Sequence, residues 1–218
     1  VIIRDASSDD KSISPKIIGG RIVVNQTEFS FMVSVRTKGR HICGGSIVDY
    51  RHVLTAAHCC FNNENKPLPP QMMSIAAGTL NIRYLDSFTV IKNAHEIIVH
   101  PRYQPENILN DIAIIRVHFF NNVSILIKLL KISGQFEKWN KHVSPISLAN
   151  FIPASGNCTI CGWGNTSRLN YQLLYVNVPI INEYRCKNYY KEITSKMICA
   201  GGNGRDSCQV TSAIHHET

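Results

Sequence analysis

The 218 residues suit one or two domains, and a hydrophobic content of 44% is enough for a sizeable buried core. The formal net charge is +8, but the Lys and Arg residues are scattered without interleaved aromatic residues, so nucleic-acid binding is not expected. No apolar run reaches the ~18–20 residues that a membrane-crossing helix needs, so no membrane span is expected either.

Residues 1–16 are polar and end in Pro15-Lys16, a composition typical of a flexible, exposed leader. The segment that follows, Ile17 to Gly20, reads Ile-Ile-Gly-Gly. We therefore place a boundary between residues 16 and 17.

The first half of the chain carries short strand patterns, and no helical period persists there for ten residues. A turn at Thr37 to Arg40 predicts a hairpin between strands at 29–35 and 42–48. Further strands are expected at the ranges 72–77, 88–91 and 94–100. This spacing favours an all-β barrel or sandwich.

Two residues of this half have the chemistry of an acid–base site. His58 follows a buried strand pattern and two alanines, and imidazole changes its charge near neutral pH. Asp111 leads directly into the apolar strand Ile112 to Ile115, where an unpaired charge is costly. Asp111 is therefore expected to have a hydrogen-bonding partner.

The second half reads Cys-Gly-Trp-Gly from Cys161, then a strand at 176–181, a short helix at 183–190 and a strand at 197–202. Cys158 and Cys161 could also form a redox or zinc motif, but no second cysteine pair or spaced histidines accompany them.

The segments around His58, Asp111 and Cys161 resemble the trypsin/chymotrypsin family of serine endopeptidases, from Ile17 to about Gln209. The resemblance implies an all-β double barrel of the trypsin/chymotrypsin type. Residues 17–128 would form the first barrel, and residues 129–218 a second barrel that is incomplete at the C-terminus. No cofactor and no metal is expected.

The resemblance also implies roles for single residues. His58 would take and return the proton, Asp111 would orient the imidazole of His58, and Ser212 is in register with the nucleophile. Asp206 occupies the position that selects Lys or Arg substrates. A trypsin-like protease would cut after Lys16, and the freed Ile17 ammonium would fold inward. The implied disulfides are Cys43–Cys59 and Cys186–Cys199, which leave Cys60, Cys158, Cys161 and Cys208 without an implied partner.

Eight cysteines and four Asn-x-Ser/Thr triplets favour an oxidising, secretory compartment. The candidate glycosylation sites are Asn25, Asn122, Asn157 and Asn165. We therefore expect a secreted, extracellular protein whose partners are protein substrates cut at Lys or Arg, an activating protease and protease inhibitors.

After Gln209 the chain departs from the family motif Gly-Asp-Ser-Gly-Gly-Pro and reads Val210, Thr211, Ser212. Three interpretations remain open: an active endopeptidase, a catalytically dead homologue that binds substrates or inhibitors, and an incomplete product of an active enzyme's gene. The substitutions favour a chain with little or no activity.

Overall fold

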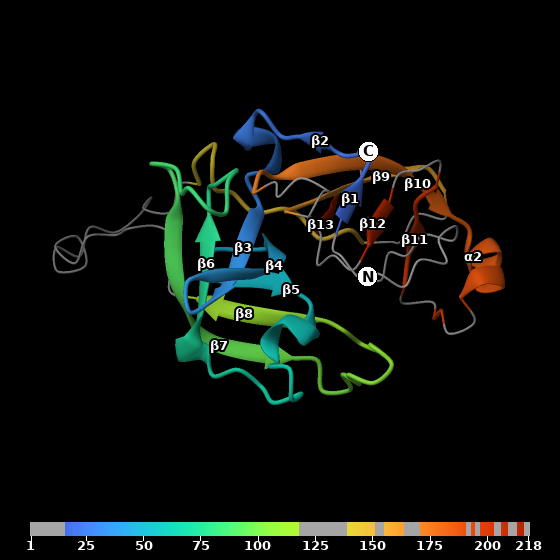
Figure 1. Cartoon of the computed structure of the whole chain (residues 1–218), viewed down its shortest axis with the longest axis horizontal. Helices are drawn as coiled ribbons and strands as arrows, with labels where there is room; N and C mark the ends of the chain where they lie inside the picture. The colour runs from blue at the N-terminus through green and yellow to red at the C-terminus, as the bar shows by residue number, and fades with distance from the viewer. Residues whose placement is uncertain are drawn as a thin grey trace, which may run out of the picture. The chain divides into compact units, whose positions relative to one another are not determined.

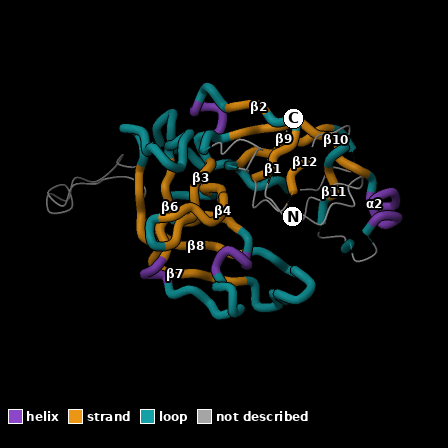
Figure 2. Tube along the Cα trace, viewed as in Figure 1, coloured by secondary structure: helices purple, strands orange, loops and turns teal. Residues whose placement is uncertain are grey.

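The computed structural model describes residues 16–117, 139–150, 155–163, 171–190, 193–194, 197–202, 206–208 and 213–215. These residues are mainly strands and loops (Figures 1 and 2), with α2 (Glu183–Tyr189) as the α-helix among them. They divide into two compact units. The barrel unit comprises residues 25–79 and 87–147, and the sheet unit comprises residues 1–24, 80–86 and 148–218.

Six antiparallel strands of the barrel unit close on themselves in the order β3-β4-β5-β8-β7-β6. Their bounds are β3 (Met32–Thr37), β4 (Arg40–Ile47), β5 (His52–Thr55), β6 (Met73–Ala77), β7 (Val90–Val99) and β8 (Ala113–Val117). Because a closed barrel leaves no edge strand, its backbone hydrogen bonds are satisfied within the unit. The all-β barrel expected from the sequence is confirmed.

The hairpin expected around Lys38 and Gly39 joins β3 to β4, with Thr37 opposite Arg40. Lys38 has φ of 48° and Gly39 has φ of 77°. Two consecutive residues of positive φ make the tight turn whose twist matches that of the flanking strands.

The strand expected from residue 29 starts later, at Met32, because the 3-10 helix η1 (Gln26–Phe29) precedes it. The Asn25 side chain caps this helix by accepting a hydrogen bond from the backbone N–H of Thr27 at 3.2 Å. There are two further 3-10 helices: η2 (Ala57–Cys60) follows β5, and η3 (Pro70–Met72) precedes β6.

The two strands expected at 88–91 and 94–100 are one strand, β7. It pairs with β6 over Val90–Asn93 and with β8 from Ala94 onward. The register shifts between Ala94 and Glu96, which is the signature of a bulge. The bulge lets β7 change its pairing partner from β6 to β8, so the strand continues through the polar residues at its centre.

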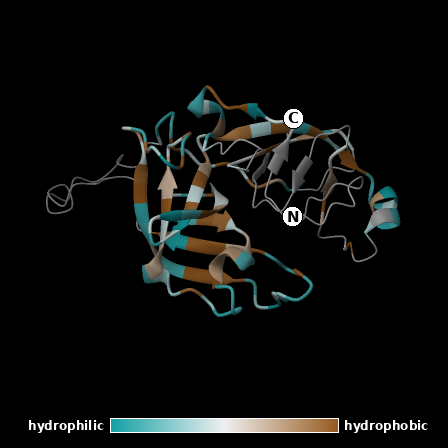
Figure 3. Cartoon of the chain, in the orientation of Figure 1, coloured by the Kyte–Doolittle hydropathy of each residue, from teal (hydrophilic) through white to brown (hydrophobic). Residues whose placement is uncertain are grey.

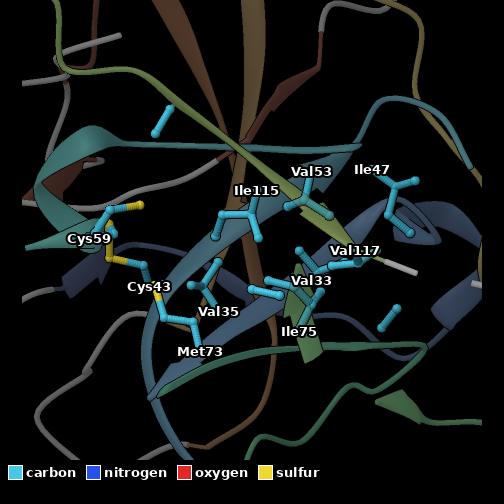
Figure 4. Close-up of a cluster of buried hydrophobic side chains, with 14 of the residues drawn as sticks. Val33, Val35, Cys43, Ile47, Val53, Cys59, Met73, Ile75, Ile115 and Val117 are labelled. Carbon is cyan, nitrogen blue, oxygen red and sulfur yellow. A yellow bond between two sulfur atoms is a disulfide. The ribbon is translucent and has the colours of Figure 1, made fainter. Parts of the chain in front are cut away.

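The barrel interior is filled by aliphatic side chains (Figure 4), which come from strands with many hydrophobic residues (Figure 3). Val33, Val35, Ile75 and Ile115 are each 0% exposed. Burying one such side chain stabilises the fold by about 1.5–3 kcal/mol relative to leaving it exposed.

The sheet unit is open among the described residues. Its strands are β1 (Lys16–Ile18), β2 (Arg21–Ile22), β9 (Asn157–Gly162), β10 (Leu174–Ile181), β11 (Cys199–Ala200), β12 (Asp206–Cys208) and β13 (Ala213–His215). The order β11-β10-β9-β13 forms the main sheet, β2 also pairs with β10, and β1 pairs with β12 alone.

The expected helix at 183–190 is observed as α2, capped by the Asn182 side chain, which accepts from the backbone N–H of Tyr184 at 2.8 Å. The strand expected at 197–202 is shorter, at Cys199–Ala200, and positive φ values of Gly201 and Gly202 follow it. No helix in the described parts of the chain is both long and apolar enough to cross a membrane.

Candidate functional site

His58 lies on the short 3-10 helix η2, which follows β5 of the barrel. Ala57, which precedes it, is 0% exposed, so this turn is packed into the barrel. A disulfide joins Cys43 of β4 to Cys59, with their Cα atoms 6.2 Å apart (Figure 4). These contacts fix the backbone on both sides of His58, while its side chain remains 50% exposed.

Asp111 lies just before β8, and both of its carboxylate oxygens hold His58. Asp111 Oδ2 lies 2.8 Å from His58 Nδ1, and Asp111 Oδ1 accepts from the His58 backbone N–H at 2.8 Å. The Asp111 side chain is 10% exposed. The hydrogen-bonding partner expected for this aspartate is therefore His58, held at its ring and at its main chain.

The electrostatics of this pair favour an ionised carboxylate. Burial alone would raise the pKa of Asp111, but hydrogen bonds from the His58 side chain and backbone outweigh it and hold this pKa below its ordinary value of 3.8. Asp111 therefore carries its negative charge at neutral pH and stabilises a proton on His58 Nδ1.

The second ring nitrogen of His58, Nε2, is not engaged by the carboxylate. It lies 3.4 Å from Cys59 Sγ and 4.0 Å from Cys43 Sγ. An imidazole held at Nδ1, with half of its side chain exposed, can accept a proton at Nε2 from a neighbouring group and return it. This is the chemistry of a general base.

The same three atoms, Nε2 and the two sulfurs, lie within 4.8 Å of one another, which is close enough to hold a metal ion. The sulfurs are joined to each other as a disulfide and offer no thiolate, the form in which cysteine binds metals. The residues present do not fit a metal site.

Cys60, next to the disulfide, is 1% exposed. Burial, with the nearby charge of Asp111, raises the pKa of its thiol to about 12. Since the thiolate is the nucleophilic form, Cys60 does not compete with an acid–base reaction at His58.

The other expected site residues lie in the sheet unit. Lys16 and Ile17 are in β1, which pairs with β12 so that Ile17 is opposite Ser207 and Ile18 is opposite Asp206. Only the backbone is described there. Ser212, expected at the nucleophile position, lies outside the described residues.

The second disulfide joins Cys186 of α2 to Cys199 of β11. Cys158 and Cys161 are both buried in β9 and lie three residues apart. Side chains three apart on a strand point to opposite faces of the sheet, so these two sulfurs cannot share one ion.

Of the expected glycosylation sites, Asn25 and Asn157 are exposed, and Asn122 and Asn165 lie outside the described residues.

One supporting contact was not predicted from the sequence. Thr55, buried at the end of β5, donates from Oγ1 to the backbone carbonyl of Gly44 at 2.8 Å. This bond joins β5 to β4 where the chain leaves towards His58. A hydroxyl residue at the buried end of a strand is the signal that indicates such a contact, because a buried hydroxyl needs a partner.

Several known proteases are similar to this chain in sequence. A family model described as Trypsin matches residues 17–212. The chain is 33% identical over 207 residues to Trypsin beta of Drosophila erecta, a match that covers 89% of this chain and 70% of that protein. It is 34% identical over 202 residues to Serine protease 1 of Canis lupus familiaris, covering 89% of this chain and 71% of the relative. For Trypsin II-P29 of Gallus gallus the identity is 31%, with the same coverage of 89% and 71%.

Proposed function

Because the chain belongs to the trypsin family of serine proteases, we propose that His58 and Asp111 are the general base and its orienting carboxylate. The observation that carries this proposal is the double hydrogen bond from His58 to Asp111. In the trypsin-type mechanism a serine hydroxyl attacks the peptide carbonyl, and the histidine takes its proton and gives it to the leaving amine. Ser212 is the serine in register for that attack.

We assign to Asp206 the recognition of Lys or Arg in the substrate, by pairing its carboxylate with the substrate cation. The substrates would then be proteins or peptides with exposed Lys or Arg, and inhibitors that present these residues would bind as well. The two disulfides support a secreted, extracellular location, because disulfides persist in oxidising compartments. The exposed Asn25 and Asn157 are compatible with glycosylation there.

Activation would follow the zymogen route, with residues 1–16 as the leader. A trypsin-like protease would cut between Lys16 and Ile17, and the new ammonium would need a buried carboxylate as its partner. Here Thr211 stands where the family motif has the aspartate. A buried ammonium without a counter-ion costs several kcal/mol, so cleavage alone would not order the site.

The loop before Ser212 carries a second substitution, since Val210 replaces the first glycine of the family motif. A β-branched residue is strained in the positive-φ conformations that glycine adopts freely. Losing one backbone donor of an oxyanion hole lowers the rate by about 10²–10³-fold. We therefore infer that this chain hydrolyses peptides very slowly.

A second candidate is a catalytically dead homologue that binds substrates or inhibitors. It is favoured by the contrast between the intact His58–Asp111 pair and the substituted positions 210 and 211. The two candidates differ in hydrolysis: the first predicts slow hydrolysis that Ser212→Ala abolishes, and the second predicts binding without hydrolysis.

The test uses the full chain after cleavage at Lys16, with an arginyl amide as substrate and an aromatic amidine as a mimic of the arginine side chain. We expect hydrolysis at least about 100-fold slower than that of an ordinary trypsin, together with amidine binding that Asp206→Ser abolishes. A rate within tenfold of trypsin, lost in both Ser212→Ala and His58→Ala, would overturn the inference of low activity. Unchanged amidine binding in Asp206→Ser would overturn the assigned specificity.

A further inference from the structure

The carboxylate of Asp111 stands at the end of a long loop, residues 100–112, that joins β7 to β8. Backbone hydrogen bonds connect the two arms of this loop at its base and near its tip. At the base, the His100 N–H donates to the Ile112 carbonyl at 3.0 Å. Near the tip, Gln104 and Leu109 exchange two backbone hydrogen bonds of 3.0 and 3.2 Å.

Between these two points a side chain makes the cross-connection. The Asn110 amide, through Nδ2, donates to the Arg102 carbonyl at 2.7 Å. Asn110 thus takes the place of a backbone rung at the centre of the loop. It does so one residue before Asp111.

The backbone of Asn110 has an uncommon conformation. Its φ is 53°, in the left-handed region that asparagine tolerates better than most residues with a side chain. Its carbonyl accepts from the Ile112 N–H at 2.8 Å. A hydrogen bond between residues i and i+2 closes a γ-turn, and Asp111 is the central residue of that turn.

We propose that Asn110 is a positioning residue that aims the Asp111 carboxylate at His58. The inference rests on the proposed function in taking Asp111 as the orienting group. The left-handed backbone conformation of Asn110 sets the direction in which the Asp111 side chain leaves the main chain. The hydrogen bond from Asn110 to the Arg102 carbonyl holds that conformation in place. Both oxygens of Asp111 must meet His58 at 2.8 Å, so a small displacement of the turn weakens both hydrogen bonds.

The experiment separates the two features of Asn110 in the full chain. Asn110→Ala removes the amide and puts a residue that disfavours positive φ in its place. Asn110→Gly also removes the amide but accepts the backbone conformation. Asn65, with φ of 56° in a different loop of the barrel unit, provides the matched control, since Asn65→Ala introduces the same backbone strain away from Asp111.

The readout is the proton on His58 Nδ1, observed by NMR in histidine-labelled protein, with its rate of exchange with solvent. We expect exchange at least tenfold faster in Asn110→Ala, a smaller increase of threefold or more in Asn110→Gly, and a rate within twofold of the parent in Asn65→Ala. If Asn110→Ala does not fold, Asn110→Gly decides alone.

A His58 proton that exchanges within twofold of the parent rate in every folded Asn110 variant would overturn the proposal. An equal acceleration in Asn65→Ala would also overturn it, because general loosening of the barrel unit would then explain the result. The readout does not depend on hydrolysis. If the amide assay contradicts the proposed function, the geometric role of Asn110 is still decided by these exchange rates.

Discussion

Ser34 Oγ lies 2.9 Å from His41 Nδ1 across the first hairpin of the barrel. Ser34 is 0% exposed, and the two residues belong to the neighbouring strands β3 and β4. Burial, together with the positive charge of Arg36, lowers the pKa of His41 from its ordinary value of 6.5 to about 4. His41 is therefore neutral in the folded chain at pH values where the unfolded chain already protonates it.

This difference predicts a pH-dependent stability. Between pH 6.5 and about 4 the unfolded chain binds a proton at His41 that the folded chain does not, so the free energy of unfolding falls as the pH falls. The whole loss in the free energy of unfolding is about 3 kcal/mol, since a shift of one pKa unit corresponds to about 1.36 kcal/mol. Urea denaturation of the parent and of His41→Gln at several pH values measures it. The same slope in both proteins would show that His41 is not the titrating group.

The barrel core gives a second prediction, from two isoleucines on neighbouring strands. Ile115 of β8 is 0% exposed, whereas Ile98 of β7 is 46% exposed. Ile115→Ala should lower the free energy of unfolding by about 2–5 kcal/mol, because it removes buried methyl groups and leaves a cavity. Ile98→Ala should change it by roughly 0.5 kcal/mol or less. Equal losses in the two variants would contradict the packing described for this barrel.

The pairing of β1 with β12 gives a third prediction. The bond between Lys16 and Ile17, proposed as the activation site, lies within β1, whose residues are paired with Asp206–Cys208. Because proteases bind their substrates in an extended form, this pairing should slow cleavage. Because successive N–H groups of a strand point in opposite directions, only one of Ser207 and Cys208 donates towards β1. One of the variants Ser207→Pro and Cys208→Pro therefore removes a donor that faces β1. We expect that variant to be cut at Lys16 at least tenfold faster by an added trypsin. A parent cleaved as fast as its unfolded form would contradict the prediction.

Much of the barrel follows from local sequence patterns. Lys38 and Gly39 suit a two-residue turn, and alternation of apolar residues predicts strands on either side. The positions of η1 and of the bulge in β7 were not predicted. The first depends on an Asn25 cap, and the second on a change of partner from β6 to β8, which no local pattern contains.

The candidate site was predicted only in part. The residues alone predicted that Asp111 needs a partner, because a buried aspartate at a strand entrance is costly when unpaired. The resemblance to the protease family implied that this partner is His58. The use of both carboxylate oxygens, and the connection from Asn110 to Arg102, depend on contacts made in the folded loop. Hydrogen bonds between residues as far apart in the chain as 58 and 111 cannot be derived from spacing.

We propose that positions 210 and 211 prevent a working site from forming behind an intact His58–Asp111 pair. The key step is the fate of the Ile17 α-amino group after cleavage at Lys16, since Thr211 offers no negative charge to receive an ammonium. Thr211→Asp, which restores a carboxylate at that position, is the matched comparison.

The most direct measurement is the rate at which an acylating reagent labels the Ile17 α-amino group in the folded, cleaved chain. We predict labelling within twofold of the rate for a free peptide with the same N-terminus, and slower labelling in Thr211→Asp. Protection of tenfold or more in the parent chain, accompanied by hydrolysis of an arginyl amide, would contradict the claim.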